Sequence, residues 1–164
     1  MLALGIDPGT AICGYGLVEL SGTRLKAVHY GAITTPAKMA PEQRLLRIHE
    51  ELNQLIAEYK PDIIGVEQLF FNRNVTTAIS VGQARGVILL TAAENDVPIR
   101  EFTPLQVKQS VVGYGKATKE QVIYMVTRLL NLPKPPHPDD VADALAVAIC
   151  TTHAADSRMW GGSL

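Results

Sequence analysis

The order of apolar segments along the 164-residue chain constrains its fold more than any other feature. Strand-like segments near the N-terminus come first, and the turn-forming Ser21-Gly22-Thr23 separates the last two of them. Helical spacing of apolar residues then alternates with short apolar runs that are typical of strands. This order predicts an α/β fold in which a mixed five-stranded sheet has helices on both faces. We expect strands over 2–7, 14–20, 24–34, 63–67 and 97–102, and helices over 41–59, 76–95, 118–130 and 139–152, with a short helix opened by Thr103-Pro104.

Composition restricts the class of protein further. With 47% hydrophobic and 19% charged residues, the chain can bury a core, so disorder is excluded. The charge balance of 15 Lys and Arg against 16 Asp and Glu means that any site for a polyanion is a local patch. The N-terminus lacks the features of a signal peptide, and no uncharged run approaches the roughly 20 apolar residues that span a bilayer. We expect a cytoplasmic protein without a membrane partner, with one domain over 1–153, a flexible tail over 154–164, and Cys13 and Cys150 as buried free thiols.

Four carboxylates stand at positions that suit metal-dependent chemistry. Asp7 and Glu67 each end an apolar strand, whereas Asp140 and Asp143 share one face near the start of the last helix. Strand ends and a helix start can converge at one sheet edge, where crowded carboxylates repel unless cations neutralise them. Oxygen ligands of this kind suit Mg²⁺ or Mn²⁺.

Each of these acids also has a purely structural explanation. An Asp after a strand is often a turn former, and Asp139 and Asp140 are both good caps at a helix start. Asp143 is harder to explain in this way, because it lies one turn inside an Ala-rich helix whose small residues permit close packing on a sheet. Spacing alone leaves the convergence of the four acids open.

A series of motifs over about residues 1–150 resembles the RuvC family of bacterial Holliday-junction resolvases. The matching segments, in the family's order, are Gly5-Ile6-Asp7-Pro8-Gly9-Thr10, Gly14-Tyr15-Gly16, Val66-Glu67-Gln68-Leu69-Phe70-Phe71, Gly82-Gln83-Ala84-Arg85-Gly86, Gln106-Val107-Lys108-Gln109, Val111-Val112-Gly113-Tyr114-Gly115 and Asp140-Val141-Ala142-Asp143-Ala144-Leu145-Ala146. The resemblance implies a ribonuclease-H-like fold and a homodimer. It also implies a metal-dependent endonuclease that resolves four-way DNA junctions by paired nicks in two strands of like polarity during recombination and repair, with 5′-phosphate products.

The same resemblance assigns roles to the acids. Asp7 would bridge two Mg²⁺ ions per subunit, with Mn²⁺ as an alternative, while Glu67 serves one ion and Asp140 and Asp143 serve the other. Asp139 competes with Asp140 for the third position, although the spacing of the motif favours Asp140. Since some relatives place histidine at that position, His137 is a further candidate. The family also implies delivery of the junction by the RuvA–RuvB branch-migration complex.

Basic and aromatic residues supply candidate DNA contacts. Between Thr103 and Leu130 the charged residues are four cations and one acid, which gives the local positive patch that the overall charge requires. Lys108 and Lys119 match lysines of the family that contact DNA, Lys116 and Arg73 are additional candidates, and Arg128 is better explained as part of a solvated face. Phe70 matches a ring inserted at the junction, although a core role for it and its neighbour Phe71 stays open. Gly82 and Gly86 correspond to a region near the dimer interface of the family.

Other functions remain to be weighed. The Asp7-Pro8-Gly9-Thr10 turn also fits the phosphate loop of ATP-binding proteins of the actin and sugar-kinase fold, but 164 residues without a repeat are too few for the two domains those proteins use. A junction-binding protein without catalysis is disfavoured by the presence of all four acids. A nuclease with a different substrate, such as an RNA–DNA hybrid, shares the expected fold.

Overall fold

The computed structural model describes residues 1–68 and 75–159 of the chain. Its five-stranded sheet has the order β3-β2-β1-β4-β5, and the strands are β1 (Leu2–Asp7), β2 (Ile12–Ser21), β3 (Arg24–Thr34), β4 (Ile63–Glu67) and β5 (Ile99–Phe102). Antiparallel pairing joins β1, β2 and β3, whereas β4 and β5 continue the sheet in parallel with β1. The predicted mixed five-stranded sheet is therefore confirmed.

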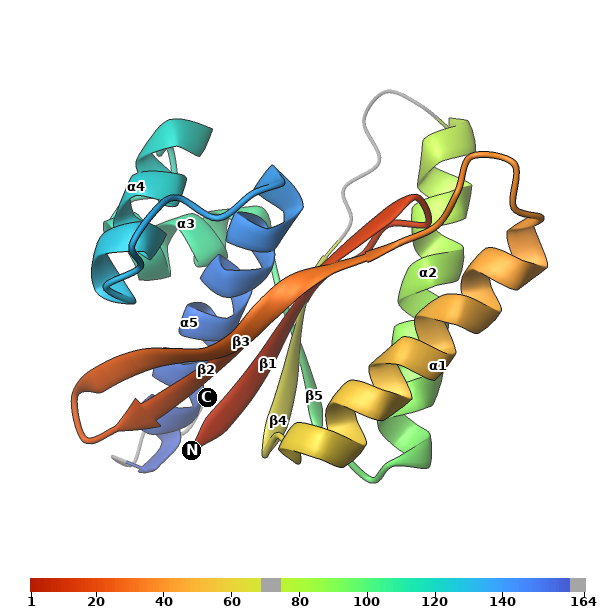
Figure 1. Cartoon of the computed structure of the whole chain (residues 1–164). Coiled ribbons are helices and arrows are strands. Elements are labelled where there is room, and N and C mark those ends of the chain that lie inside the picture. Colours follow the sequence, from red (N-terminus) through yellow and green to blue (C-terminus); the bar gives the residue numbers. More distant parts are fainter. Residues whose placement is uncertain (69–74, 160–164) are drawn as a thin grey trace.

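Helices cover both faces of this sheet, as the order of segments predicts (Figure 1). On one face lie α1 (Pro41–Tyr59) and α2 (Val75–Glu94), and on the other lie α3 (Pro104–Val112), α4 (Lys119–Leu129) and α5 (Asp139–Met159). Each face has its own apolar core. Strand alternation separates them, because Leu4 and Ile6 of β1 belong to the core beneath α1 and α2 while Gly5 faces α5.

Local sequence signals account for the starts of α3 and α4. Thr103 and Thr118 cap α3 and α4 through complete capping boxes with Gln106 and Gln121, so both predicted N-termini are confirmed. The last helix was expected to end near Thr152, but α5 continues to Met159 and so passes through the start of the predicted tail. The Ala-rich repeat that marks the buried part of α5 ends before the helix does, which explains the difference. Cys13 and Cys150 are buried free thiols, as expected.

Glycines on the sheet let α5 approach it unusually closely. A Cβ atom at Gly5 would collide with the main chain of Ala144 and Ala148, and one at Gly14 would collide with the main chain of Asp140. Both glycines lie on the face that α5 covers, and the residues of α5 opposite Gly5 are the small Ala144 and Ala148. The helix can thus lie directly on β1 and β2, which places its first turns beside the end of β1.

Substitution of Gly14 by Ala tests this close approach. The added methyl has no free space against Asp140, so we expect Gly14→Ala to lower the free energy of unfolding by about 1–3 kcal/mol and to reduce activity with it. The matched control is Gly82→Ala in α2, where no described residue lies within 4 Å of the new atom and helix propensity favours Ala by roughly 0.5–1 kcal/mol. Urea unfolding measures both. Equal effects of the two substitutions would show that packing of α5 does not depend on Gly14.

Candidate active site

Asp7 and Glu67 end neighbouring parallel strands. Ile6 of β1 lies opposite Val66 of β4 in the sheet register, so the next residue on each strand brings the two acids to the same edge. Each strand interior is buried while the terminal carboxylate is partly exposed. The predicted convergence of these two acids at one sheet edge is therefore present in the fold.

Asp140 and Asp143 reach the same edge from the first turns of α5. The main chain of Asp140 lies against Gly14, and Gly14 is the register partner of Asp7. Asp143 follows one turn later, and its side chain is 29% exposed within an otherwise buried run of the helix. The close packing of α5 on β2 is thus what brings the helix carboxylates to the strand carboxylates.

The electrostatics show how crowded these acids are. Burial, followed by the repulsion of neighbouring carboxylates, raises the pKa of Asp7 from 3.8 to about 8. In order of effect the neighbours responsible are Asp143, Glu67 and Asp140. Burial also raises the pKa of Glu67 and that of Asp143, the former with a further contribution from Asp143. All four predicted acids therefore belong to one interacting cluster.

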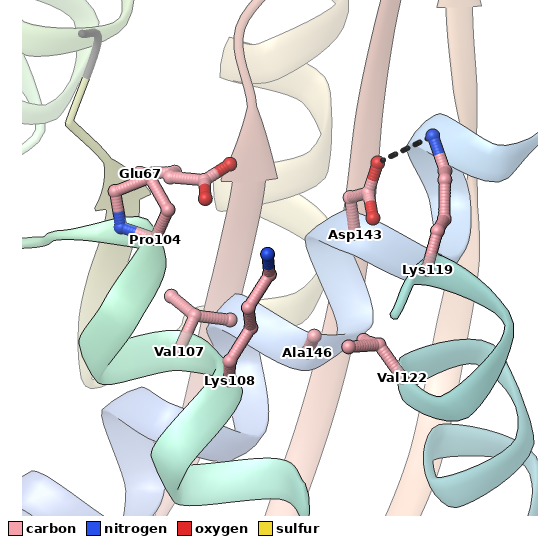
Figure 2. Close-up of a pocket in the computed structure, with 8 residues that line it drawn as sticks. All are labelled: Glu67, Pro104, Val107, Lys108, Lys119, Val122, Asp143 and Ala146. Carbon is pink, nitrogen blue, oxygen red and sulfur yellow. Dashed lines mark ion pairs between the residues drawn. The ribbon is translucent and has the colours of Figure 1, made fainter. Parts of the chain in front are cut away.

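A pocket of about 260 Å³ opens beside this cluster, and both acidic and basic side chains line it (Figure 2). Glu67 and Asp143 lie on opposite sides of it, Lys108 of α3 extends into the space between them, and Lys119 of α4 lies beside Asp143. Apolar side chains of Val107, Val122 and Ala146 complete the lining. A pocket with both charges suits a ligand that combines anionic phosphate with a metal cation.

Lys119 forms ion pairs with two carboxylates of α5. Its Nζ atom lies 3.3 Å from Oδ2 of Asp139 and 3.4 Å from Oδ2 of Asp143. Burial lowers the pKa of Lys119, but these two carboxylates outweigh that effect and the pKa is raised overall. Asp139 is therefore engaged with the lysine, while Asp140 repels Asp7, which supports the motif register that places the third acid at Asp140.

The carboxylate oxygens of the cluster are ligands that a hard divalent cation prefers, although in the described part of the chain they do not surround a single point. Among residues 1–68 and 75–159, no three His, Cys, Asp or Glu side chains already have the spacing of a metal centre. The chemistry of the cluster nevertheless fits Mg²⁺ or Mn²⁺, because buried carboxylates that repel one another are relieved by a cation with oxygen ligands. The residues that could hold it are Asp7, Glu67, Asp140 and Asp143.

Comparison with known proteins identifies the family. A family model described as crossover junction endodeoxyribonuclease RuvC matches residues 3–151. The chain belongs to the RuvC family. A curated RuvC of Heliobacterium modesticaldum is 60% identical over 161 residues, which cover 98% of each chain, and one of Desulfitobacterium hafniense is 57% identical over the whole of both.

Solved structures of the family have the same fold. Thermus thermophilus RuvC in complex with a Holliday junction substrate is 37% identical, with a TM-score of 0.90 over 98% of this chain and 96% of that one. Another structure of T. thermophilus RuvC is 36% identical, with a TM-score of 0.87 over 98% and 97%. These similarities confirm the predicted ribonuclease-H-like fold of this RuvC-family chain.

The remaining candidates lie at or outside the edge of the site. Lys116 is exposed in the loop between α3 and α4, and it does not line the pocket with Lys108 and Lys119. His137 is exposed ahead of α5. Phe70 and Arg73 lie outside the described residues. Sequence reasoning did not find the role of Gly14, although glycines that alternate along a strand opposite an Ala-rich helix are the signal that points to it.

The pKa of Asp7 predicts how stability depends on pH without metal. Because the folded-state pKa of about 8 exceeds the ordinary 3.8, the folded protein holds this proton more tightly, and stability is lost as pH rises through that window. We expect Asp7→Asn to raise the free energy of unfolding by about 1–3 kcal/mol at pH 8.5 and by much less at pH 4. Urea unfolding in the presence of a chelator measures this. A gain that is equal at both pH values would contradict the electrostatic origin.

Proposed function

We propose that this RuvC-family protein is a divalent-metal-dependent endonuclease that resolves Holliday junctions in DNA recombination and repair. The observation that supports it is the pocket that brings Glu67 and Asp143 together with Lys108 and Lys119, beside Asp7, whose pKa is raised to about 8. A phosphodiester needs cations for its negative charge and oxygen ligands for the metal that activates water, and this pocket offers both. The family relationship supports the four-way junction as substrate.

The chain's own residues divide the chemistry between them. Asp7 would bridge two Mg²⁺ ions, with Glu67 holding one and Asp140 and Asp143 the other. When bound, the metal supplies an activated water and stabilises the attacking and leaving oxygens. Lys108 and Lys119 bind the DNA backbone as point charges, which positions the scissile phosphate over the carboxylates without reading sequence.

Substitution of the carboxylates separates cutting from binding. Asp7→Asn, Glu67→Gln, Asp140→Asn and Asp143→Asn should each lower Mg²⁺-dependent cleavage by more than about 100-fold, since even the partners of metal ligands are worth about 10- to 100-fold. Junction affinity should persist because the lysines supply it. Strand-resolved cleavage of a mobile four-way junction, with gel-shift binding in parallel, measures both.

Three controls sharpen that experiment. Asp139→Asn removes the same charge one residue away, and at saturating Mg²⁺ it should keep most of the cleavage activity. Loss with Asp139→Asn but not with Asp140→Asn would overturn the assignment of the third ligand. Linear duplex and RNA–DNA hybrid substrates test the class of nuclease, since equal cutting of either one would contradict a junction-specific enzyme.

A homodimer is the second part of the proposal, and the surface of α2 supports it. Exposed residues recur along this helix with spacings of four, three, four and three, at Ile79, Gln83, Gly86, Leu90 and Ala93. Ile79 and Leu90 are 59% and 57% exposed. Such spacing is that of a helix seam which packs against another helix, and the small residues permit close approach.

The composition of α2 admits a second explanation. Its mean hydropathy of 1.3 and its length would suffice for a membrane span, and 22% of that stretch is buried in the molecule. Length and composition are the whole of that argument, whereas α2 also packs against α1 and the apolar core. We propose that a second copy covers the exposed seam. A two-fold dimer places two sites on a two-fold symmetric junction, which suits paired nicks.

Charges in the seam test the dimer. The double variant Ile79→Glu/Leu90→Glu should be monomeric at concentrations where the wild type sediments as a dimer, because it buries like charges between the copies. On a supercoiled plasmid with an extruded cruciform it should yield nicked circles in place of linear product. Val28→Glu is the matched control, since Val28 is 42% exposed on β3. A double variant that remains dimeric would remove the seam from the interface.

Two finer parts rest on the family alone. We propose that the products carry 5′-phosphate and 3′-hydroxyl ends and that the RuvA–RuvB complex delivers the junction. End-labelling of the products tests the first, and co-sedimentation with RuvA-bound junctions tests the second.

A further inference from the structure

Lys119 bridges two carboxylates of α5 that lie four residues apart. It begins α4 directly after the cap Thr118, and its Nζ atom is almost equidistant from Asp139 and Asp143, at 3.3 and 3.4 Å. Figure 2 shows the ammonium beside Asp143 at the rim of the pocket. One cation of the chain itself thus occupies part of the carboxylate cluster.

The two partners of Lys119 differ in their relation to that cluster. The side chain of Asp143 is 29% exposed and lines the pocket, whereas that of Asp139 is 55% exposed and does not. The carboxylates that act on Asp7 are Asp143, Glu67 and Asp140, and not Asp139. Asp139 is among the carboxylates that raise the pKa of Asp143, but it does not act on Asp7, so it faces the lysine from the edge of the acid cluster.

We propose that Asp139 is a positioning residue, which holds the ammonium of Lys119 at the rim of the site so that Asp143 is released for a metal ion. The inference rests on the proposed role of Asp143 as a metal ligand. A divalent cation on Asp143 must displace the ammonium that pairs with it, because both compete for the same oxygen atoms.

The geometry explains why the second carboxylate matters. A lysine that has only Asp143 as a partner competes fully with the metal. With Asp139 already at 3.3 Å, the ammonium keeps an ion pair after Asp143 is taken, and its displacement costs less. The lysine also stays beside the pocket, where a DNA phosphate can bind it. Thermodynamic linkage requires the reverse effect as well: when a metal ion binds Asp143, the ion pair between Lys119 and Asp139 becomes stronger.

A double-mutant cycle on Mg²⁺ affinity tests the proposal without DNA. Isothermal titration of the full chain with Mg²⁺ compares wild type, Asp139→Asn, Lys119→Met and the double variant. Asp139→Asn should weaken Mg²⁺ binding by about two- to fivefold, the range that an exposed ion pair permits. Lys119→Met should strengthen it, since the competing cation is gone. In the Lys119→Met background, Asp139→Asn should have no further effect.

Matched controls remove the general effect of charge. Glu120→Gln takes a carboxylate from the residue next to Lys119, and Lys26→Met removes a lysine from the opposite end of the sheet, where it pairs in register with Glu19. Both should change Mg²⁺ affinity less than the variants of the pair do. Lys119→Arg keeps the cation and should restore the sensitivity to Asp139→Asn.

The possible outcomes separate the explanations. If Asp139→Asn lowers Mg²⁺ affinity equally in the wild type and in the Lys119→Met background, Asp139 acts as a metal ligand or through its charge alone, and the proposal is overturned. If Asp139→Asn does not lower the Mg²⁺ affinity of the wild type, Asp139 has no role in metal binding, which also overturns the proposal. Labelling of Lys119 by an amine-specific reagent, read by mass spectrometry, gives a second measure, and in the presence of Mg²⁺ it should increase in Asp139→Asn. Failure of Asp143→Asn to weaken Mg²⁺ binding would instead refute the proposed metal site itself.

Discussion

The contact between α5 and the sheet is the constraint on which the site depends. Gly5 and Gly14 have no side chain to keep the helix away, so its main chain lies directly on β1 and β2. Through that contact the start of α5 reaches the register partner of Asp7, and two acids from the end of the sequence join two acids from strand ends. A wider separation would leave voids in the core on that face and would move Asp140 away from the strand carboxylates.

Bringing the four carboxylates together costs electrostatic free energy, and two lysines of the chain offset part of that cost. Packed carboxylates raise the pKa of Asp7 to about 8, and Lys119 opposes that shift from the rim of the pocket. Lys108 lowers the pKa of Glu67 from the other side. The same lysines that moderate repulsion in the absence of metal are those that would hold a DNA backbone. In the proposed enzyme, one set of charges would thus both stabilise the free protein and bind the substrate.

The two faces of the sheet serve different purposes in the proposed enzyme. On the α5 face, α3 and α4 bring lysines to the acid cluster, while on the other face α1 supports α2 and leaves an apolar seam exposed. Because the sheet separates the pocket from the exposed seam of α2, a second copy can pack on α2 without covering the pocket. In this proposal, catalysis and dimer formation would therefore use separate surfaces of the molecule.

The sequence by itself determined the strands and helices and their distribution over a mixed sheet, and it singled out the four acids as candidates, because periodicity, capping boxes and family motifs are local or ordered features of the chain. Only the tertiary structure decided which neighbours those acids have. The collision that a Cβ at Gly14 would cause and the pairing of Asp139 with Lys119 both depend on contacts between segments more than 15 residues apart, and that pairing agrees with the preference of the motif for Asp140. Likewise, the end of α5 at Met159 lies beyond the apolar pattern, since main-chain hydrogen bonds can continue a helix without further periodic signal.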